Sequence, residues 1–174
     1  MGLDHLRRAV FPDSPQYALL RRLLLAQDGS TTRLCAAAAR GKLELGLYLQ
    51  ERRSSAPAIV KESLGGTAWL ERITTLYAGT TVMMDNLSFT RLDTVPAWFL
   101  EELDQGVAPV GRLLENLFVR REPAPCSPDV EKLLWDRTDL PDPSMSRSYL
   151  VRMPEAPLMY IFETYRAGIT CVTA

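Results

Sequence analysis

The sequence predicts an α+β fold with one antiparallel sheet. Helical patterns come first, then strands, then helices again and finally strands, and the short connections between them favour antiparallel pairing over parallel crossovers. The chain has 174 residues, of which 47% are hydrophobic, enough for one compact domain with a sizeable core. No repeat, low-complexity tract or long linker divides it. We therefore expect residues 1–174 to form a single domain.

Two short helices open the chain. Ser14 is a helix-capping residue type, and a proline follows it at the first helical position, so a helix is expected over Pro15–Leu25. Residues 28–31 break the pattern and offer a second cap. The Ala-rich stretch Arg33–Arg40 then predicts another helix, with Gly41 as its stop.

Strands follow these helices. Leu43–Gln50 alternates leucine with other residues, which is the period-2 pattern of a strand with one face in the core. Trp69–Tyr77 and Thr80–Leu92 are rich in aromatic and β-branched residues, and the intervening Ala-Gly pair suits a tight turn. These two segments are expected to form a long hairpin.

The next segments are helical and then irregular. Pro96–Leu103 and Pro109–Leu117 each begin with proline, which predicts two short helices, divided at Gly106. The stretch Arg120–Asp129 contains three prolines and is expected to be an exposed loop.

The last third of the chain closes the sheet. Val130–Trp135 fits either a strand or a helix. Ser146–Met153 and Leu158–Tyr165 predict a pair of strands, joined through residues 154–157, which begin and end with proline.

Composition excludes several classes of function. Lys and Arg number 20 against 21 Asp and Glu, so no surplus of positive charge exists to neutralise phosphates, and no nucleic-acid partner is expected. The apolar runs are far shorter than the roughly 20 residues of a membrane-spanning helix, so no membrane partner is expected. The first ten residues are not followed by a signal-peptide core, which predicts a cytoplasmic protein.

The sequence contains no motif that is typical of a metal site or a cofactor site. Cys35, Cys126 and Cys171 are widely spaced without a CxxC pair, and the chain contains one histidine, so neither a zinc site nor a disulfide framework is expected. Nucleotide-binding loops and a GxSxG element are also missing. The Leu64–Thr67 segment resembles a phosphate loop, but it leads into a predicted strand and is better explained as a turn. We expect no cofactor and no metal.

Two charged residues lie inside otherwise apolar strand segments. Arg72 falls in the strand that starts at Trp69, and Glu163 follows the run Leu158–Phe162. An isolated charge is costly to bury unless it is paired. Either the two side chains point to solvent from the outer face of the sheet, or they belong to a functional site.

Five segments, in this order, resemble the chorismate pyruvate-lyase family, the bacterial 4-hydroxybenzoate synthases. The resemblance covers nearly the whole chain, and its weight comes from the order and spacing of the segments. These are Leu23–Leu25, Asp28–Arg33, Trp69–Ile73, Pro109–Leu114, and Pro157–Met159 through Phe162–Glu163.

The resemblance implies a chorismate lyase-like fold with about six antiparallel strands flanked by helices, and a pocket closed by helical flaps. It implies a cytoplasmic, cofactor-independent lyase of biosynthesis that converts chorismate, a small-molecule carboxylate, to 4-hydroxybenzoate and pyruvate. Arg72 would clamp a carboxylate and Glu163 would act as acid/base. The ligand-contacting residues would be Ser30, Thr31, Val110 and Gly111.

Two departures from the family open alternatives. Ser30 stands where the family has an apolar methionine, and the order of Glu71 and Arg72 is reversed, so the arginine could face the other side of the sheet. A second hypothesis is therefore a relative that acts on a polyketide-like intermediate of secondary metabolism, with Met83, Met84 and Met159 as an adaptable lining.

A third hypothesis is a ligand sensor, because the same fold serves as the effector-binding part of some bacterial transcription regulators. The sequence disfavours it, since 174 near-neutral residues leave no room for a helix-turn-helix. The oligomeric state cannot be read from these patterns.

Overall fold

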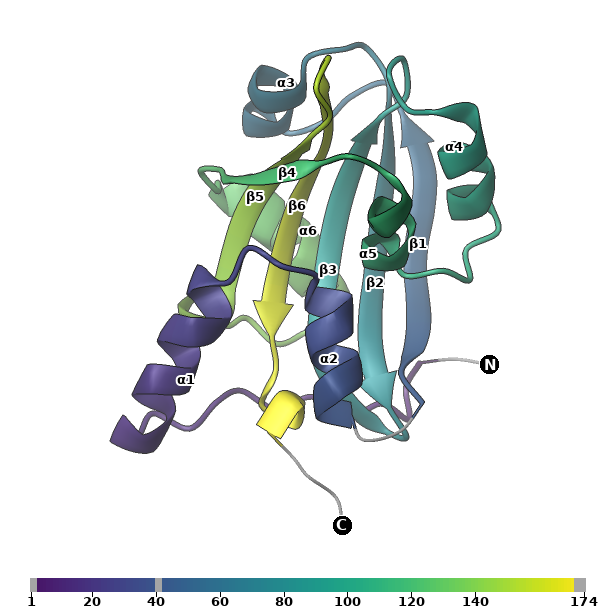
Figure 1. Cartoon of the computed structure of the whole chain (residues 1–174). Helices are drawn as coiled ribbons and strands as arrows, with labels where there is room; N and C mark the ends of the chain where they lie inside the picture. The colour runs from purple at the N-terminus through teal and green to yellow at the C-terminus, as the bar shows by residue number, and fades with distance from the viewer. Residues whose placement is uncertain (1–2, 40–41, 171–174) are drawn as a thin grey trace.

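A single antiparallel sheet of six strands organises the protein (Figure 1). The structure is a computed structural model that describes residues 3–39 and 42–170. The strand order is β1-β2-β3-β6-β5-β4, so the two hairpins predicted from sequence meet where β3 pairs with β6. The strands are β1 Glu44–Arg53, β2 Trp69–Ala78, β3 Thr81–Arg91, β4 Arg120–Pro123, β5 Ser146–Arg152 and β6 Pro157–Tyr165. The predicted α+β fold with an antiparallel, helix-flanked sheet is confirmed.

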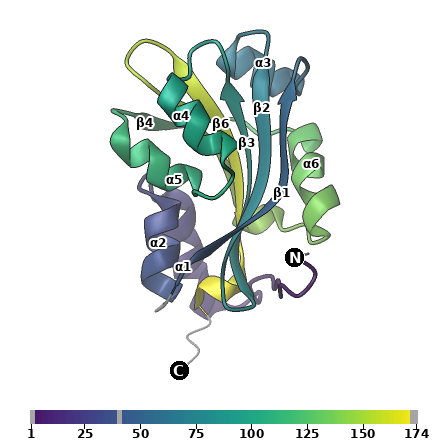
Figure 2. The ribbon, with the colours of Figure 1, turned by 90° about the vertical axis from the view of Figure 1, so that its right-hand side faces the viewer.

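Helices cover both faces of this sheet (Figure 2). One face, called here the pocket face, lies under four of them; the opposite face, called the core face, lies under the other two. The helices over the pocket face are α1 Pro15–Ala26, α2 Thr31–Ala39, α4 Ala97–Asp104 and α5 Val110–Leu113. The helices over the core face are α3 Ala58–Leu64 and α6 Pro128–Thr138.

The two faces of the central strands differ in chemistry. Along β2, Trp69 and Ile73 point into the apolar cluster of the core face, whereas Leu70, Arg72 and Thr74 point to the pocket face. All residues from 69 to 76 are buried, because helices lie on both sides. The core face of β2 also carries Glu71 and Thr75, but its cluster is built from large apolar side chains, whereas the pocket face holds Arg72 beside Thr74.

Most predicted elements are present, with shifts at their ends. The Ala78-Gly79 turn is confirmed, and Gly79 adopts a φ of 60°, which favours glycine. The second helix starts at Thr31, two residues before the predicted start, and its predicted end at Arg40 and Gly41 lies outside the described residues. The ambiguous segment Val130–Trp135 belongs to α6.

Two predictions of structure are wrong, and one helix was not predicted. Arg120–Asp129 is not entirely loop, because its first four residues pair with β5 as the edge strand β4, where a proline is tolerated at the strand end. The helix predicted over Pro109–Leu117 ends as α5 at Leu113 and continues as a 3₁₀ turn over Leu114–Asn116. Helix α3 was not predicted at all, since its seven residues are too few for a clear helical period.

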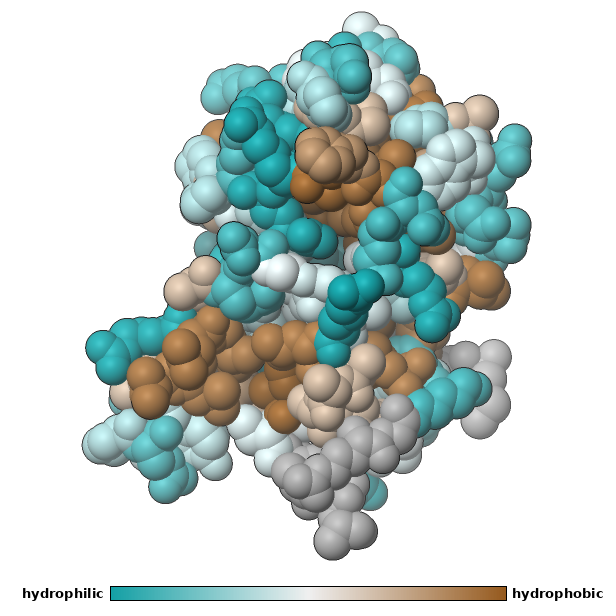
Figure 3. All heavy atoms as spheres, viewed as in Figure 1, coloured by the Kyte–Doolittle hydropathy of each residue, from teal (hydrophilic) through white to brown (hydrophobic). Residues whose placement is uncertain are grey.

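The helices are short, and one of them, α1, exposes apolar side chains. Among the described residues, no helix is long and apolar enough to cross a bilayer. Exposed apolar side chains gather over α1 in the space-filling view (Figure 3), where Leu19 and Leu23 are 58% and 59% exposed.

Candidate functional site

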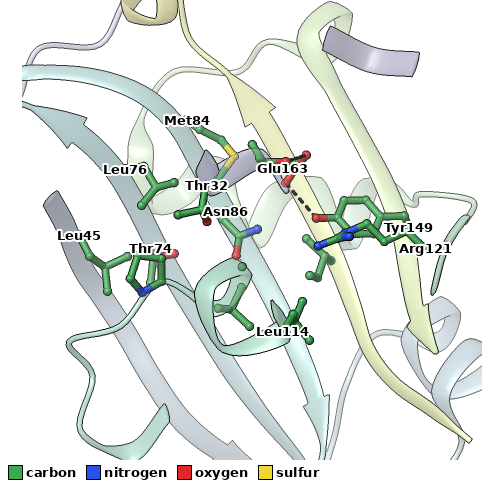
Figure 4. Close-up of a pocket in the computed structure, with 15 residues that line it drawn as sticks. Thr32, Leu45, Thr74, Leu76, Met84, Asn86, Leu114, Arg121, Tyr149 and Glu163 are labelled. Atoms are coloured by element: carbon green, nitrogen blue, oxygen red, sulfur yellow. Dashed lines mark hydrogen bonds between the residues drawn. The ribbon is translucent and has the colours of Figure 1, made fainter. Parts of the chain in front are cut away.

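A small cavity lies between the pocket face of the sheet and the helices α2 and α5 (Figure 4). Its volume is about 20 Å³, room for about one water molecule. The sheet provides Leu45, Thr74, Leu76, Met84, Asn86, Arg121, Tyr149, Ile161 and Glu163, and the helical side provides Thr31, Thr32, Pro109, Val110, Gly111 and Leu114. The pocket is therefore narrow in this structure, and a ligand larger than a water molecule requires α2 or α5 to move.

A row of polar side chains crosses the sheet at this cavity. Thr74 pairs with Asn86, Asn86 with Glu163, and Glu163 with Arg147, so four neighbouring strands contribute one residue each. Antiparallel register partners point to the same face, which brings these residues together although they are far apart in sequence.

Glu163 is the centre of the polar contacts. The residue is 1% exposed, and its Oε1 accepts hydrogen bonds from Thr31 Oγ1 at 2.9 Å and from Arg147 Nε at 2.7 Å. Its Oε2 accepts one from the Tyr149 hydroxyl at 3.1 Å (Figure 4). The Tyr165 hydroxyl also donates to Oε1, at 3.3 Å. The protein itself therefore holds this carboxylate in a fixed position.

Arg147 is the ion partner of Glu163, with Nη2 at 2.6 Å from Oε1. Its guanidinium lies over the rings of Tyr149 and Tyr165, 5.2 and 5.5 Å from their centroids. Its Nη1 donates to the carbonyl oxygens of Leu25 and Gln27. Burial acts to lower the pKa of Arg147, but the Glu163 carboxylate together with Tyr165 and Tyr149 outweighs it, and the net shift is upward. Arg147 thus joins β5 and β6 to the α1–α2 loop.

The two tyrosines at this site remain hydrogen-bond donors. Burial, and then the nearby Glu163 carboxylate, raise the pKa of Tyr149 well above its usual value, and the same two causes raise the pKa of Tyr165. A tyrosine that keeps its proton can donate to a carboxylate. Glu163 is therefore held by contacts within the protein, which extend through Thr31 and Tyr165 to the Gln27 side chain.

Arg72, predicted as the carboxylate clamp, does not contact Glu163, whose ion partner is Arg147. Arg72 lies one residue pair away on the pocket face, opposite Ser88, and it does not line the cavity. The neighbour of Arg72 shows to which side of the sheet Arg72 points. Glu71 contacts Arg53 at 2.8 Å on the core face. Because residues alternate along a strand, Arg72 points toward the helices over the pocket face.

The surroundings of Arg72 contain no acidic partner among the described residues. The residue is 2% exposed, and its Nη2 donates to the carbonyl oxygens of Ala108 at 3.0 Å and Gly106 at 3.5 Å. Its Nε has no hydrogen-bond partner. Burial lowers the pKa of this guanidinium to about 10.

The other predicted site residues divide into two groups. Thr31, Val110 and Gly111 line the cavity, whereas Ser30 does not; its Oγ accepts a hydrogen bond from the Arg33 amide at 3.3 Å, as in a helix cap. Of the three methionines predicted to line the site, Met84 does so, and Met83 and Met159 pack in the core.

Gly111 marks the contact between α5 and α2. A Cβ at this position would lie 2.4 Å from Thr32 Oγ1, which is too close for any larger residue without movement. Glycine therefore allows α5 to close over the cavity against α2.

Four residues at this site were not predicted from the sequence: Arg147, Tyr149, Tyr165 and Arg121. Arg147 falls inside the predicted strand Ser146–Met153, so its charge in a strand was a usable signal, like that of Arg72. Which acidic residue it meets depends on the register of β5 against β6, which local sequence does not contain.

The two cysteines of the described residues, Cys35 and Cys126, are not among the residues that line this cavity. Within residues 3–39 and 42–170, no group of His, Cys, Asp and Glu side chains could hold a metal ion. Cys35 is buried, which raises the pKa of its thiol, and Cys126 is exposed. Cys171 lies outside the described residues.

Comparisons with known proteins find likeness in structure alone. No protein-family model matches the chain. No curated protein matches it either. Among solved structures, the chain is similar to a GntR-family transcriptional regulator from Bacillus cereus, with 12% identity, 73% of this chain and 93% of that chain covered, and a TM-score of 0.47.

Two further solved structures are similar to this chain. One is the C-terminal domain of the histidine utilization repressor from Pseudomonas syringae pv. tomato str. DC3000, with 9% identity, 76% and 97% coverage of this and that chain, and a TM-score of 0.44. The other is the effector domain of PhnF from Mycobacterium smegmatis, with 14% identity, 80% and 89% coverage, and a TM-score of 0.40. At such identities the likeness concerns the fold.

These neighbours overturn the family and the activity that the sequence resemblance implied. They are a transcriptional regulator and domains of such regulators, not chorismate pyruvate-lyases. The prediction of a lyase that makes 4-hydroxybenzoate and pyruvate from chorismate is therefore wrong, and so is the prediction of an enzyme, which includes the polyketide-directed alternative. Short apolar segments in a shared order reflect a shared fold, and they do not carry the chemistry of one family.

Proposed function

We propose that this protein is a non-catalytic binding domain for a small molecule that carries a carboxylate, and that Arg72 is the counter-ion of that carboxylate. The observation that carries the proposal is the guanidinium of Arg72, which is buried without an acidic partner among the described residues. Burying an unpaired charge in a protein costs on the order of several kcal/mol unless another group compensates it. A ligand carboxylate supplies that compensation.

The chemistry of the two groups supports a carboxylate. A guanidinium presents its N–H groups in a planar fork that matches the two oxygens of a carboxylate, and such charge-assisted pairs are about twice as strong as neutral hydrogen bonds. Arg72 now uses only Nη2, on two neutral carbonyl oxygens, and leaves Nε free. A carboxylate is therefore a better acceptor than the groups it would replace.

The position of Arg72 suggests how the ligand is admitted. Its acceptors, Gly106 and Ala108, belong to the loop between α4 and α5, and the next residues, Pro109 and Val110, line the cavity. If the ligand takes over the guanidinium, this loop is released and α5 moves away from the sheet. The small volume of the cavity then reflects the closed state of a site that opens on binding.

Binding rather than turnover follows from the state of Glu163. Its carboxylate is already engaged by Arg147, Thr31, Tyr149 and Tyr165, so its role in the proposal is to fix the α1–α2 loop and the wall of the pocket. We also propose that residues 1–174 act as one domain, since strands from residue 44 to residue 165 share the sheet that carries the site.

The test is a thermal-shift screen of the purified protein against aliphatic and aromatic carboxylates, with the amide of each acid as its neutral control. We expect at least one acid to raise Tm in a concentration-dependent way while its amide does not. The Arg72→Met variant should remain folded by circular dichroism and lose the response. If acids and amides act equally, or if Arg72→Met responds like the unchanged protein, the proposal is wrong.

A further inference from the structure

A second compartment adjoins the narrow cavity on the side of the α1–α2 loop. Its volume is about 150 Å³, and it lies between the end of α1, β4 and β5. Arg121 and Tyr149 line both spaces, so these two side chains form the partition between them. Figure 4 shows Arg121 and Tyr149 side by side at this edge of the cavity.

The walls of this second compartment combine apolar surface with one cation that lacks an ion partner. Leu25, Ala26, Pro123 and the ring of Tyr149 provide apolar surface. An apolar cavity of about 150 Å³ is large enough to hold a benzene ring. The compartment therefore has room for a group of ring size without any movement of the chain.

Of the charged side chains that line the compartment, Arg147 and Glu122 are paired, whereas Asp28 and Arg121 form no salt bridge among the described residues. Arg147 pairs with Glu163, and Glu122 pairs with Arg152 at 2.6 Å. Arg121 has no salt bridge among the described residues: its Nη1 donates to the Asp28 carbonyl oxygen at 3.3 Å.

The Nε of Arg121 is buried and has no hydrogen-bond partner. A buried donor without an acceptor costs about 1–3 kcal/mol, and an anionic acceptor would recover this cost with the extra strength of a charge-assisted bond. The unsatisfied N–H of Arg121 therefore lies at the edge of the second compartment, which is large enough for a benzene ring.

We propose that this compartment is a binding subsite for a ring-sized anionic group, with Arg121 as its ion partner and the Tyr149 ring as its apolar floor. The chemical class is an aromatic or cyclic acid. The proposal is independent of the role assigned to Arg72, because the two arginines lie on β2 and β4, separated by three strands of the sheet.

The test uses benzoate as probe and benzamide as its uncharged counterpart, with affinity measured by ligand-detected NMR titration on the full chain. We expect benzoate to bind and benzamide to bind at least tenfold more weakly. Arg121→Met should weaken benzoate binding about tenfold or more, as expected for loss of a hydrogen bond to a charged group.

A matched control lies on the same strand. Arg120 is 74% exposed and pairs with Glu122 at 2.7 Å, and it lines neither space, so Arg120→Met removes the same charge from β4 and should leave benzoate affinity within twofold. Ala26→Phe provides a second variant that fills the compartment without touching a charge, and it should reduce benzoate binding to a similar degree as Arg121→Met.

Three results would overturn the subsite: no benzoate binding, an Arg121→Met affinity within twofold of the unchanged protein, or equal losses in Arg120→Met and Arg121→Met. The Arg72→Met variant separates the two proposals. Benzoate binding that survives Arg72→Met but not Arg121→Met supports the subsite alone. The opposite pattern supports the carboxylate site at Arg72 and removes the subsite.

Discussion

Two buried arginines point to the same face of the sheet and have opposite surroundings. Arg147 meets a carboxylate, stacks on two tyrosine rings and donates to loop carbonyls, whereas Arg72, in the described part of the chain, contacts two backbone carbonyl oxygens and no acid. Both side chains are largely buried, 13% and 2% exposed. The difference shows that burial of a charge does not define its role: the first arginine is part of the framework, and the second is left for a partner from outside.

The largest effect is expected when the framework pair is broken. Arg147→Met leaves Glu163 buried without a cation, which should lower the free energy of unfolding by about 3–5 kcal/mol. Urea unfolding followed by circular dichroism measures this loss.

The double variant Arg147→Met with Glu163→Leu should recover most of the loss, because no charge is then left unpaired. Arg152→Met, on the same strand, is the matched control, since its pair with Glu122 is about one-third exposed and should contribute about 1 kcal/mol or less. If the single and double variants are equally unstable, the pair is not the source of the effect.

Replacing Arg72 should change the free energy of unfolding much less than replacing Arg147. Arg72→Met removes an uncompensated buried charge, at the expense of hydrogen bonds to Gly106 and Ala108. These contributions oppose each other, so we expect the free energy of unfolding to stay within about 1 kcal/mol of the unchanged protein, or to rise. The same urea experiment checks this, and a loss of more than about 3 kcal/mol would make Arg72 a framework residue like Arg147.

The smallest effect that we expect is a loss of stability at alkaline pH. Tyr149 and Tyr165 have raised pKa values in the folded protein, against about 10 in the unfolded chain. A raised folded pKa contributes stability that is complete below about pH 10 and is lost as pH rises toward the folded value. The lowered pKa of Arg72, about 10, acts with the opposite sign above that pH.

Absorbance of tyrosinate at 295 nm measures this directly. We expect Tyr149 and Tyr165 to ionise only when the protein unfolds, so that the Tyr149→Phe, Tyr165→Phe double variant loses part of the late alkaline rise. A double variant with the same late amplitude as the unchanged protein would show that these hydroxyls ionise in the folded state.

Several features of the protein could be predicted from the sequence. The hairpin of β2 and β3, with Gly79 at its turn, follows from strand patterns and from a residue type that adopts positive φ. The prediction that Thr31, Val110 and Gly111 border a pocket came from a family resemblance and agrees with the lining of the cavity. The enzymatic activity came from the same resemblance and is wrong, because a fold does not determine the chemistry of its site.

What the sequence alone determined was the type of most elements and the presence of two isolated charges in apolar strands, because hydrophobic period and turn residues act within a few positions. Only the tertiary structure decided the partners of those charges. Glu163 meets Arg147 because β5 and β6 pair in one register. Arg72 has no acidic partner within residues 3–39 and 42–170, because the loop after α4 covers it with carbonyl oxygens. These contacts join residues far apart along the chain, and long-range pairing depends on how whole strands and helices pack rather than on any local pattern.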